Sequence, residues 1–283
     1  MINKVAIVGA GTMGSGIALS VAQSGCNVVM FDVNDAVLLK ASKTILHNVN
    51  KLVEKEKISR EIADDVINRI TFTNAMSDCI ADVIIEAIVE KLEVKHEVFL
   101  QLAEINSPTT ILASNTSSLS ISAIQKNIPF PNRIAGMHYF NPAHIMKLVE
   151  IIRGNDTDDN TIQTLASFAK LQQKTPVICS DSPGFIVNRV ARHFYLESLK
   201  AAEKGAADIK VIDEILEATG FKMGPFKLMD MIGMDINLAV TESLYHAFNE
   251  TVRFKPNMLQ IEKVKNGDLG RKTGKGFYLY NNV

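Results

Sequence analysis

The sequence has few cysteines, no excess of charge of either sign and no long uninterrupted apolar run. Its 283 residues include three cysteines, which form no Cys-x-x-Cys pair, so neither a disulfide framework nor a metal site such as zinc is expected. A formal net charge of −1 argues against a nucleic-acid partner or a polybasic membrane patch. The most apolar stretch, residues 80–89, is too short to span a bilayer, and Asp82 and Glu86 interrupt it. The absence of a signal-peptide pattern after Met1 adds to the expectation of a soluble, cytoplasmic protein with no membrane partner.

A glycine-rich turn follows the first apolar run directly and is followed by a helical pattern. Its residues are Gly9, Ala10, Gly11, Thr12, Met13 and Gly14. In a strand–turn–helix context, Gly9 permits the sharp turn, Gly11 lets the backbone approach a pyrophosphate, and Gly14 allows the helix to pack closely on the strand. The unpaired N–H groups at the start of the helix favour the phosphates. This pattern predicts an adenine-dinucleotide site.

The acidic partner of this turn is Asp32, which lies at the end of a second apolar run, residues 27–31. A carboxylate at this position accepts hydrogen bonds from the adenosine ribose hydroxyls and repels a 2′-phosphate. No arginine follows it in Val33-Asn34, so NAD is favoured over NADP. The alternative is a purely structural turn with an incidental acidic residue at a strand end.

Strand-like runs alternate with helical patterns over the first 180 residues. The further strands are expected at 71–73, 82–88, 110–114, 133–139, 147–152 and 176–179, and the helices at 35–56, 60–68, 91–105 and 159–171. This alternation is typical of the α/β class, with a mostly parallel sheet wound on both faces. The connection between the runs at 133–139 and 147–152 is too short for a crossover helix, so these two strands are expected to be antiparallel neighbours.

After residue 184 the pattern becomes helical, with helices expected at 187–203, 208–218, 230–251 and 256–265. We therefore predict a doubly wound Rossmann-type domain over residues 1–184, which binds NAD. An all-helical domain for substrate binding and dimerisation would follow over residues 185–283. About a hundred residues make a small core, which favours packing against a second copy of the chain, as a homodimer or a higher homo-oligomer.

One histidine and one glutamate form a candidate catalytic pair. If the two antiparallel strands pair around a turn centred near residue 144, His138 and Glu150 face each other. A buried carboxylate beside histidine fixes the tautomer and stabilises the imidazolium, as an acid–base catalyst in hydride transfer requires. The alternative is a strand-end histidine with a structural hydrogen bond and an unrelated charge on an edge strand.

A polar segment, residues 114–118, follows the strand expected at 110–114. Ligands of doubly wound sheets bind at the carboxyl ends of strands, so this segment is well placed to contact one. Helix capping by Ser118 or Ser120 explains the same residues, and the two roles are compatible.

Together these motifs resemble the 3-hydroxyacyl-CoA dehydrogenase family, and within it the single-function bacterial type that acts on short-chain 3-hydroxybutyryl-CoA. The resemblance covers essentially the whole length. Besides the glycine turn and Asp32, it rests on residues 114–119 (SNTSSL), 138–142 (HYFNP) with 148–150 (LVE), 181–189 (DSPGFIVNR), 224–226 (GPF) with Asp230, Gly233 and Asp235, and 272–278 (KTGKGFY).

The resemblance implies reversible hydride exchange between NAD(H) and C3 of a 3-hydroxyacyl-CoA. It implies His138 as general base, Glu150 as its partner, and Ser117 and Asn188 as donors to the C3 oxygen. It further implies that Glu90, Lys95 and Lys272 contact NAD. Asn115 would lie near both NAD and the substrate.

Lys51 and Lys55 lie four residues apart in a long helical pattern and are candidates for the phosphates of coenzyme A. The alternative is a solvated helix face, which is the usual explanation of a lysine-rich helix. Two other functions remain open: an NAD-dependent dehydrogenase of a free hydroxy acid or sugar acid, and a dinucleotide-binding protein without turnover.

Overall fold

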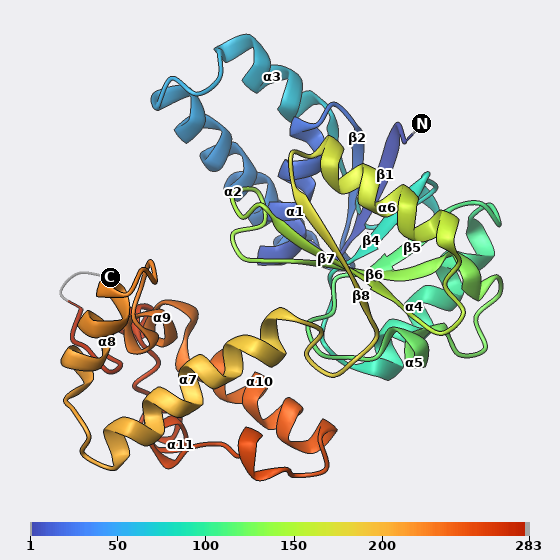
Figure 1. Ribbon diagram of the computed structural model, residues 1–283. Helices are drawn as coiled ribbons and strands as arrows, with labels where there is room; N and C mark the ends of the chain where they lie inside the picture. The colour runs from blue at the N-terminus through green and yellow to red at the C-terminus, as the bar shows by residue number, and fades with distance from the viewer. Residues whose placement is uncertain (1, 281–283) are drawn as a thin grey trace. The chain divides into compact units, whose positions relative to one another are not determined.

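The computed structural model describes residues 2–280 of the chain (Figure 1). The polypeptide forms two compact units, one extending to Ser182 and the other beginning at Pro183. The first contains every strand of the main sheet and the second is built from helices. The division of NAD binding, substrate binding and dimerisation between two domains stays a prediction.

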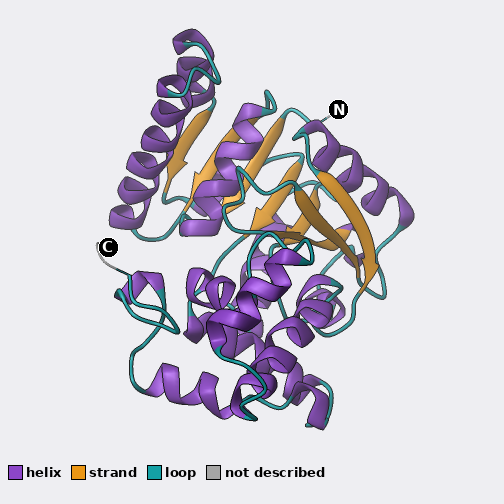
Figure 2. Ribbon diagram, turned by 60° about the vertical axis from the view of Figure 1, so that its left-hand side comes forward, coloured by secondary structure: helices purple, strands orange, loops and turns teal. Residues whose placement is uncertain are grey.

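The first unit is organised around one eight-stranded sheet in the order β3-β2-β1-β4-β5-β6-β7-β8. Its strands are β1 (Lys4–Val8), β2 (Asn27–Phe31), β3 (Ile70–Thr73), β4 (Val83–Glu86), β5 (Ile111–Ser114), β6 (Ile134–Tyr139), β7 (Leu148–Arg153) and β8 (Thr175–Ser180). Helices cover both faces, as a doubly wound fold requires (Figure 2). The expected fold class is confirmed.

Helices connect most of these strands and make up the second unit. They are α1 (Thr12–Gln23), α2 (Asp35–Glu54), α3 (Arg60–Asn68), α4 (Leu92–Ile105), α5 (Ile121–Gln125), α6 (Asp159–Leu171), α7 (Val187–Glu203), α8 (Ile209–Ala218), α9 (Pro225–Ile232), α10 (Met234–Ala247) and α11 (Met258–Lys265). Between residues 2 and 280, no helix is long and apolar enough to cross a membrane.

The central strands are mostly apolar, because helices bury them from both sides. In β1, the four residues from Val5 to Val8 have no exposed surface. The same continuous burial holds for β4 and β5, which lie beside each other in the sheet. Strands covered on both faces lack the alternation of polar and apolar residues that marks a solvent-facing sheet.

The pair β6–β7 is the antiparallel step in this sheet, as the short connection predicts. All the other neighbouring strands are parallel, including β7 and β8. Since β7 returns beside β6 after a turn, residues from the two strands face each other in a fixed register: Gly136 opposite Ile152, and Tyr139 opposite Val149.

The second unit has a small apolar core around Leu199, Phe226 and Met234, to which α7, α9 and α10 contribute. The single helix expected over residues 230–251 is wrong. Gly233 adopts a φ of 101° and separates α9 from α10, and α10 ends at Ala247 before Asn249 and Glu250, which both have positive φ. A glycine in such a conformation ends a helix at little steric cost.

Candidate active site

The strand order reverses between β1 and β4, and this point positions the candidate cofactor site. From β1 the chain proceeds outward through β2 and β3 on one side, and then returns to place β4 on the other side of β1. At such a point the loops that follow the two strands turn to opposite faces of the sheet, and a crevice forms at the carboxyl ends of the strands. The strand ends themselves are close at the base of this crevice: a Cβ on Gly9, after β1, would lie 2.7 Å from the carbonyl oxygen of Ala87, after β4.

The glycine turn has the geometry that a bound dinucleotide requires. Gly9 has a φ of 104°, and a Cβ on Gly14 would lie only 1.8 Å from the Gly9 carbonyl oxygen, so the first turn of α1 packs directly on the loop. A Cβ on Gly11 would meet no atom within 4 Å, which leaves open space beside the backbone. No side chain of residues 2–280 caps the start of α1, so its N–H groups remain suited to a phosphate.

Asp32 is held in position at the end of β2 by backbone donors. Ala10 N–H donates to Oδ2 at 2.9 Å, and Asn34 N–H donates to Oδ1 at 3.0 Å. The carboxylate is half-buried, and each oxygen retains a second lone pair that can accept a ribose hydroxyl. The residues of the turn and Asp32 therefore fit an adenine dinucleotide.

His138 and Glu150 lie opposite each other in the β6–β7 ladder, as the turn position predicts. His138 Nδ1 lies 2.8 Å from Glu150 Oε2, and the two residues are 6% and 1% exposed. A carboxylate in this position orients the ring through Nδ1 and fixes its tautomer. The pair has the arrangement of a general acid–base; a catalytic role stays a prediction.

Glu90, in the segment after β4, holds the polar segment after β5. Its Oε1 accepts hydrogen bonds from Thr116 Oγ1 at 2.5 Å and from Ser117 N at 2.9 Å, and Ser118 donates to it as well. Burial alone would raise the pKa of Glu90, but Lys95 and these hydrogen bonds hold that pKa below its usual value. An ionised Glu90 thus fixes the backbone that carries Ser117.

Lys95 lies beneath this arrangement, in α4, and is 1% exposed. Its ammonium lies 3.2 Å from Glu90 Oε2 and 2.6 Å from Glu86 Oε1. The structure therefore gives Lys95 a supporting contact to Glu90. The contacts of Glu90 and Lys95 with NAD stay predictions.

Glu86 is a residue of this network that the sequence analysis missed. It ends β4 with no exposed surface, and it accepts hydrogen bonds from Lys95, Ile88 N and Ser114 Oγ. The available signal was a carboxylate at the end of a fully apolar strand, because such a charge needs a buried partner. Its side-chain partners, Lys95 and Ser114, lie 9 and 28 residues away, which strand and helix periodicity does not reveal.

Asn115 and Ser120 have defined local roles. Asn115 Oδ1 accepts a hydrogen bond from Tyr139 N at 2.9 Å and so links the end of β5 to the end of β6. Ser120 is the residue that caps α5, through Ala123 N. Ser118 instead contacts Glu90, so capping accounts for part of the polar segment only. A position of Asn115 near both ligands stays a prediction.

Two predicted site residues belong to the second unit. Asn188 is the second residue of α7 and is half-buried. Lys272 is exposed, and its ammonium lies 2.6 Å from both carboxylate oxygens of Asp235. Their roles toward substrate and cofactor stay predictions.

The helix that was expected to carry Lys51 and Lys55 ends earlier than predicted. α2 ends at Glu54, so Lys55 caps the helix, although its N–H still bonds to the Lys51 carbonyl. Both side chains are exposed, and no contact distinguishes them from a solvated surface. Their contact with coenzyme A stays a prediction.

A cavity of about 420 Å³ lies beside the glycine turn, within the first unit. Its walls are the start of α1, one face of α2 and the turn between β6 and β7. This volume falls in the range of small-molecule sites.

Two family models match consecutive parts of the chain. Residues 4–182 match the model described as 3-hydroxyacyl-CoA dehydrogenase, NAD binding domain. Residues 184–280 match the model of the 3-hydroxyacyl-CoA dehydrogenase C-terminal domain.

Curated proteins and solved structures agree with the models. The chain is 43% identical over 98% of its length to 3-hydroxyadipyl-CoA dehydrogenase of Escherichia coli, of which it spans 59%. It is 39% identical over 98% of its length to a probable 3-hydroxybutyryl-CoA dehydrogenase of Deinococcus radiodurans, of which it spans 100%. The crystal structure of (S)-3-hydroxybutyryl-CoA dehydrogenase from Ralstonia eutropha superposes with a TM-score of 0.95 and 39% identity, and each chain is covered completely.

Proposed function

The chain belongs to the NAD-dependent 3-hydroxyacyl-CoA dehydrogenase family, and from this premise we propose that it interconverts (S)-3-hydroxybutyryl-CoA and acetoacetyl-CoA. The observation that carries the chemistry is the buried pair of His138 and Glu150, whose atoms Nδ1 and Oε2 lie 2.8 Å apart. The short acyl chain is supported by the names of two relatives.

In the oxidative direction, neutral His138 takes the proton of the C3 hydroxyl. Because Nδ1 faces Glu150, the proton transfers to Nε2, and the Glu150 carboxylate stabilises the imidazolium that results. NAD held by the glycine turn and Asp32 would supply the acceptor for the hydride from C3. In the reductive direction, protonated His138 returns the proton to the oxygen of the 3-ketoacyl group.

Ser117 and Asn188 are proposed to donate hydrogen bonds to the C3 oxygen. Donors at this position stabilise the negative charge that develops on a carbonyl during its reduction. The backbone N–H of Ser117 donates to Glu90, which fixes the position from which the Ser117 side chain extends. The other proposed contacts are those of Glu90, Lys95, Asn115 and Lys272 with NAD, and those of Lys51 and Lys55 with coenzyme A.

The test of the reaction is an NADH oxidation assay with the full chain. We expect turnover with acetoacetyl-CoA and little or none with free acetoacetate. Equal activity on the free acid would favour the alternative of a hydroxy-acid dehydrogenase, and no turnover on either would favour a binding protein without catalysis. Because one relative is named for 3-hydroxyadipyl-CoA, the oxidation of that substrate is compared with that of 3-hydroxybutyryl-CoA in the same assay.

Cofactor choice is tested at Asp32. Asp32→Ala removes the acceptor for the ribose hydroxyls and the repulsion of a 2′-phosphate, so NAD binding should weaken much more than NADP binding. Titration of each cofactor measures both constants. An unchanged preference would contradict the proposed ribose contact.

We further propose that the enzyme is a homodimer, or a higher homo-oligomer, through the helical unit, and that it works in the cytoplasm. Large apolar side chains are exposed on that unit: Val190 is 65% exposed, Ile215 57% and Phe221 51%. Light scattering should give at least twice the mass of one chain. The three cysteines are unpaired, which is compatible with a reducing compartment.

A further inference from the structure

A second cavity of the first unit contains a buried ammonium group without a protein counter-ion. The cavity has a volume of about 390 Å³ and lies between α1, α3, the turn before β7 and the segment that joins α6 to β8. Lys174, in that segment, is 7% exposed. Its Nζ donates to the carbonyl oxygens of Ala143 at 2.6 Å and Met146 at 2.9 Å. Among residues 2–280 no carboxylate forms an ion pair with it.

A buried charge is normally paired, because burial removes it from water. Two carbonyl oxygens satisfy two of the three ammonium protons but supply no full negative charge. Burial accordingly lowers the pKa of Lys174. An anion from outside the chain would supply the missing charge.

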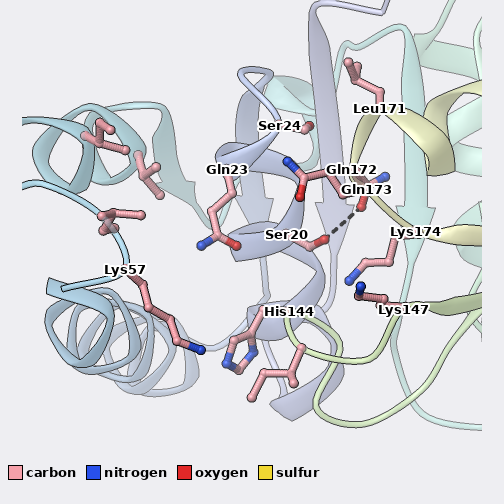
Figure 3. Close-up of a pocket in the computed structure, with 14 residues that line it drawn as sticks. Ser20, Gln23, Ser24, Lys57, His144, Lys147, Leu171, Gln172, Gln173 and Lys174 are labelled. Atoms are coloured by element: carbon pink, nitrogen blue, oxygen red, sulfur yellow. Dashed lines mark hydrogen bonds between the residues drawn. The ribbon is translucent and has the colours of Figure 1, made fainter. Parts of the chain in front are cut away.

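Further cationic or polar groups line the same cavity. Figure 3 shows Lys57 and His144 on one side and Lys147 and Lys174 on the other. No aspartate or glutamate of the described chain lines it. His144 Nδ1 is buried and has no hydrogen-bond partner among the described residues. Burial and the nearby Lys174 charge both lower the pKa of His144.

Hydrogen bonds between buried side chains link the elements that form the inner wall of the cavity. Ser20 Oγ donates to Gln172 Oε1 at 3.1 Å, which links α1 to the end of α6. Tyr139 OH also donates to this amide oxygen at 3.1 Å. These three polar side chains are all buried. A wall fixed by such hydrogen bonds is preorganised, which lowers the entropic cost of binding.

From this arrangement we propose that the cavity binds a phosphate group of a small molecule, on Lys174, Lys57, Lys147 and His144. Two sources have this chemistry: the phosphorylated end of coenzyme A, which extends the proposed function, and a free phosphorylated metabolite. His144 also lines the cavity beside the glycine turn, so the two cavities adjoin at that residue. Lysine ammonium groups recognise phosphate as compact point charges.

The first experiment measures binding without catalysis. Inorganic phosphate and adenosine 3′,5′-bisphosphate are titrated calorimetrically into the full chain. The double variant Lys57→Met/Lys147→Met keeps the aliphatic stems, and both lysines are exposed, so the fold should survive. We expect saturable binding that is about tenfold weaker in the double variant. Lys126→Met, another exposed lysine of the first unit, is the control and should bind as the unaltered chain does.

The second experiment identifies the source. The unaltered chain and the double variant are assayed with acetoacetyl-CoA and with acetoacetyl-N-acetylcysteamine, which carries the same acyl group but no phosphate. If the double variant has a higher KM for acetoacetyl-CoA and an unchanged KM for acetoacetyl-N-acetylcysteamine, coenzyme A is the source of the phosphate. Unchanged KM values together with weakened bisphosphate binding identify a separate metabolite.

Two results would overturn the proposal: neither probe binds the unaltered chain, or the double variant binds both as tightly as the unaltered chain. The calorimetric experiment does not depend on turnover. If the proposed reaction fails while phosphate binds, only the catalytic assignment is lost.

Discussion

Two buried carboxylates in the same sheet, Glu86 and Glu150, have different partners. Glu86 is fully buried and pairs with Lys95, while Glu150 is 1% exposed and pairs with His138. The Lys95 ammonium has donor protons and no acceptor atom, and it contacts the carboxylates of Glu86 and Glu90. The imidazole of His138 contacts Glu150 through Nδ1, and its second ring nitrogen, Nε2, is the atom proposed to exchange a proton with a substrate. The partner, more than the burial of the carboxylate, separates a structural ion pair from a candidate catalytic one.

The largest effect should follow from His138→Asn. Loss of a general acid–base should lower turnover by about two to four decades. Steady-state kinetics with acetoacetyl-CoA measure this loss, and NADH titration verifies that the cofactor still binds. The control is His47→Asn, at an exposed position of α2. Near-normal turnover of the His138 variant would remove His138 from the mechanism and make both carboxylate pairs structural.

Glu86→Gln should mainly reduce stability. It leaves the buried Lys95 ammonium with Glu90 as its single carboxylate partner, and breaking a buried ion pair costs about 3 kcal/mol. Urea unfolding gives the free energy of unfolding. Turnover per folded molecule should change by only a few fold. A loss of turnover as large as that of the His138 variant, with normal stability, would erase the distinction between the two pairs.

Glu150→Gln should lower kcat by roughly one to two decades. The variant retains an acceptor for the ring but loses the charge-assisted hydrogen bond, which contributes about 1.5–3 kcal/mol. Glu104→Gln, on the exposed side of α4, is the matched control. Here kcat and the free energy of unfolding are measured on the same preparation. A variant that loses stability but keeps kcat would give Glu150 the role assigned to Glu86.

The smallest effect is expected in the acid stability that Glu90 provides. The pKa of Glu90 is lowered in the folded chain, so its contribution to stability is present above the unfolded value near 4.5. This contribution is lost as the pH falls through the lower, folded pKa. Unfolding measured between pH 6 and pH 3 should show a smaller decline in Glu90→Gln than in the unaltered chain, because other carboxylates with lowered pKa values, such as Asp158 and Asp235, still contribute. Identical profiles would mean that Glu90 does not stabilise the segment that carries Ser117 as an ion.

Local signals predicted much of the fold. The bounds expected for α3 and α6 agree with the structure to the residue, because Ser59 and Asp158 cap them through hydrogen bonds to backbone N–H groups three residues later. The pairing of His138 with Glu150 was accessible for a similar reason. A short turn fixes the register of two antiparallel strands.

Contacts between distant segments could not be predicted in this way. The network of Glu86, Lys95 and Glu90 joins β4, α4 and the segment after β4, and from the sequence Glu86 merely interrupts an apolar stretch. The break at Gly233 was hidden because apolar residues continue at helical spacing on both sides of it. Buried Lys174 likewise depends on the carbonyl groups of a turn about thirty residues away.

The antiparallel step between β6 and β7 also bears on how this protein could be redesigned. Backbone hydrogen bonds of the ladder hold His138 opposite Glu150, and the turn that joins the two strands, residues 140–147, contributes neither side chain. That turn lines both cavities of the first unit. Protein engineers could therefore exchange residues of this turn while His138 and Glu150 stay opposite each other, provided that the strands keep their register.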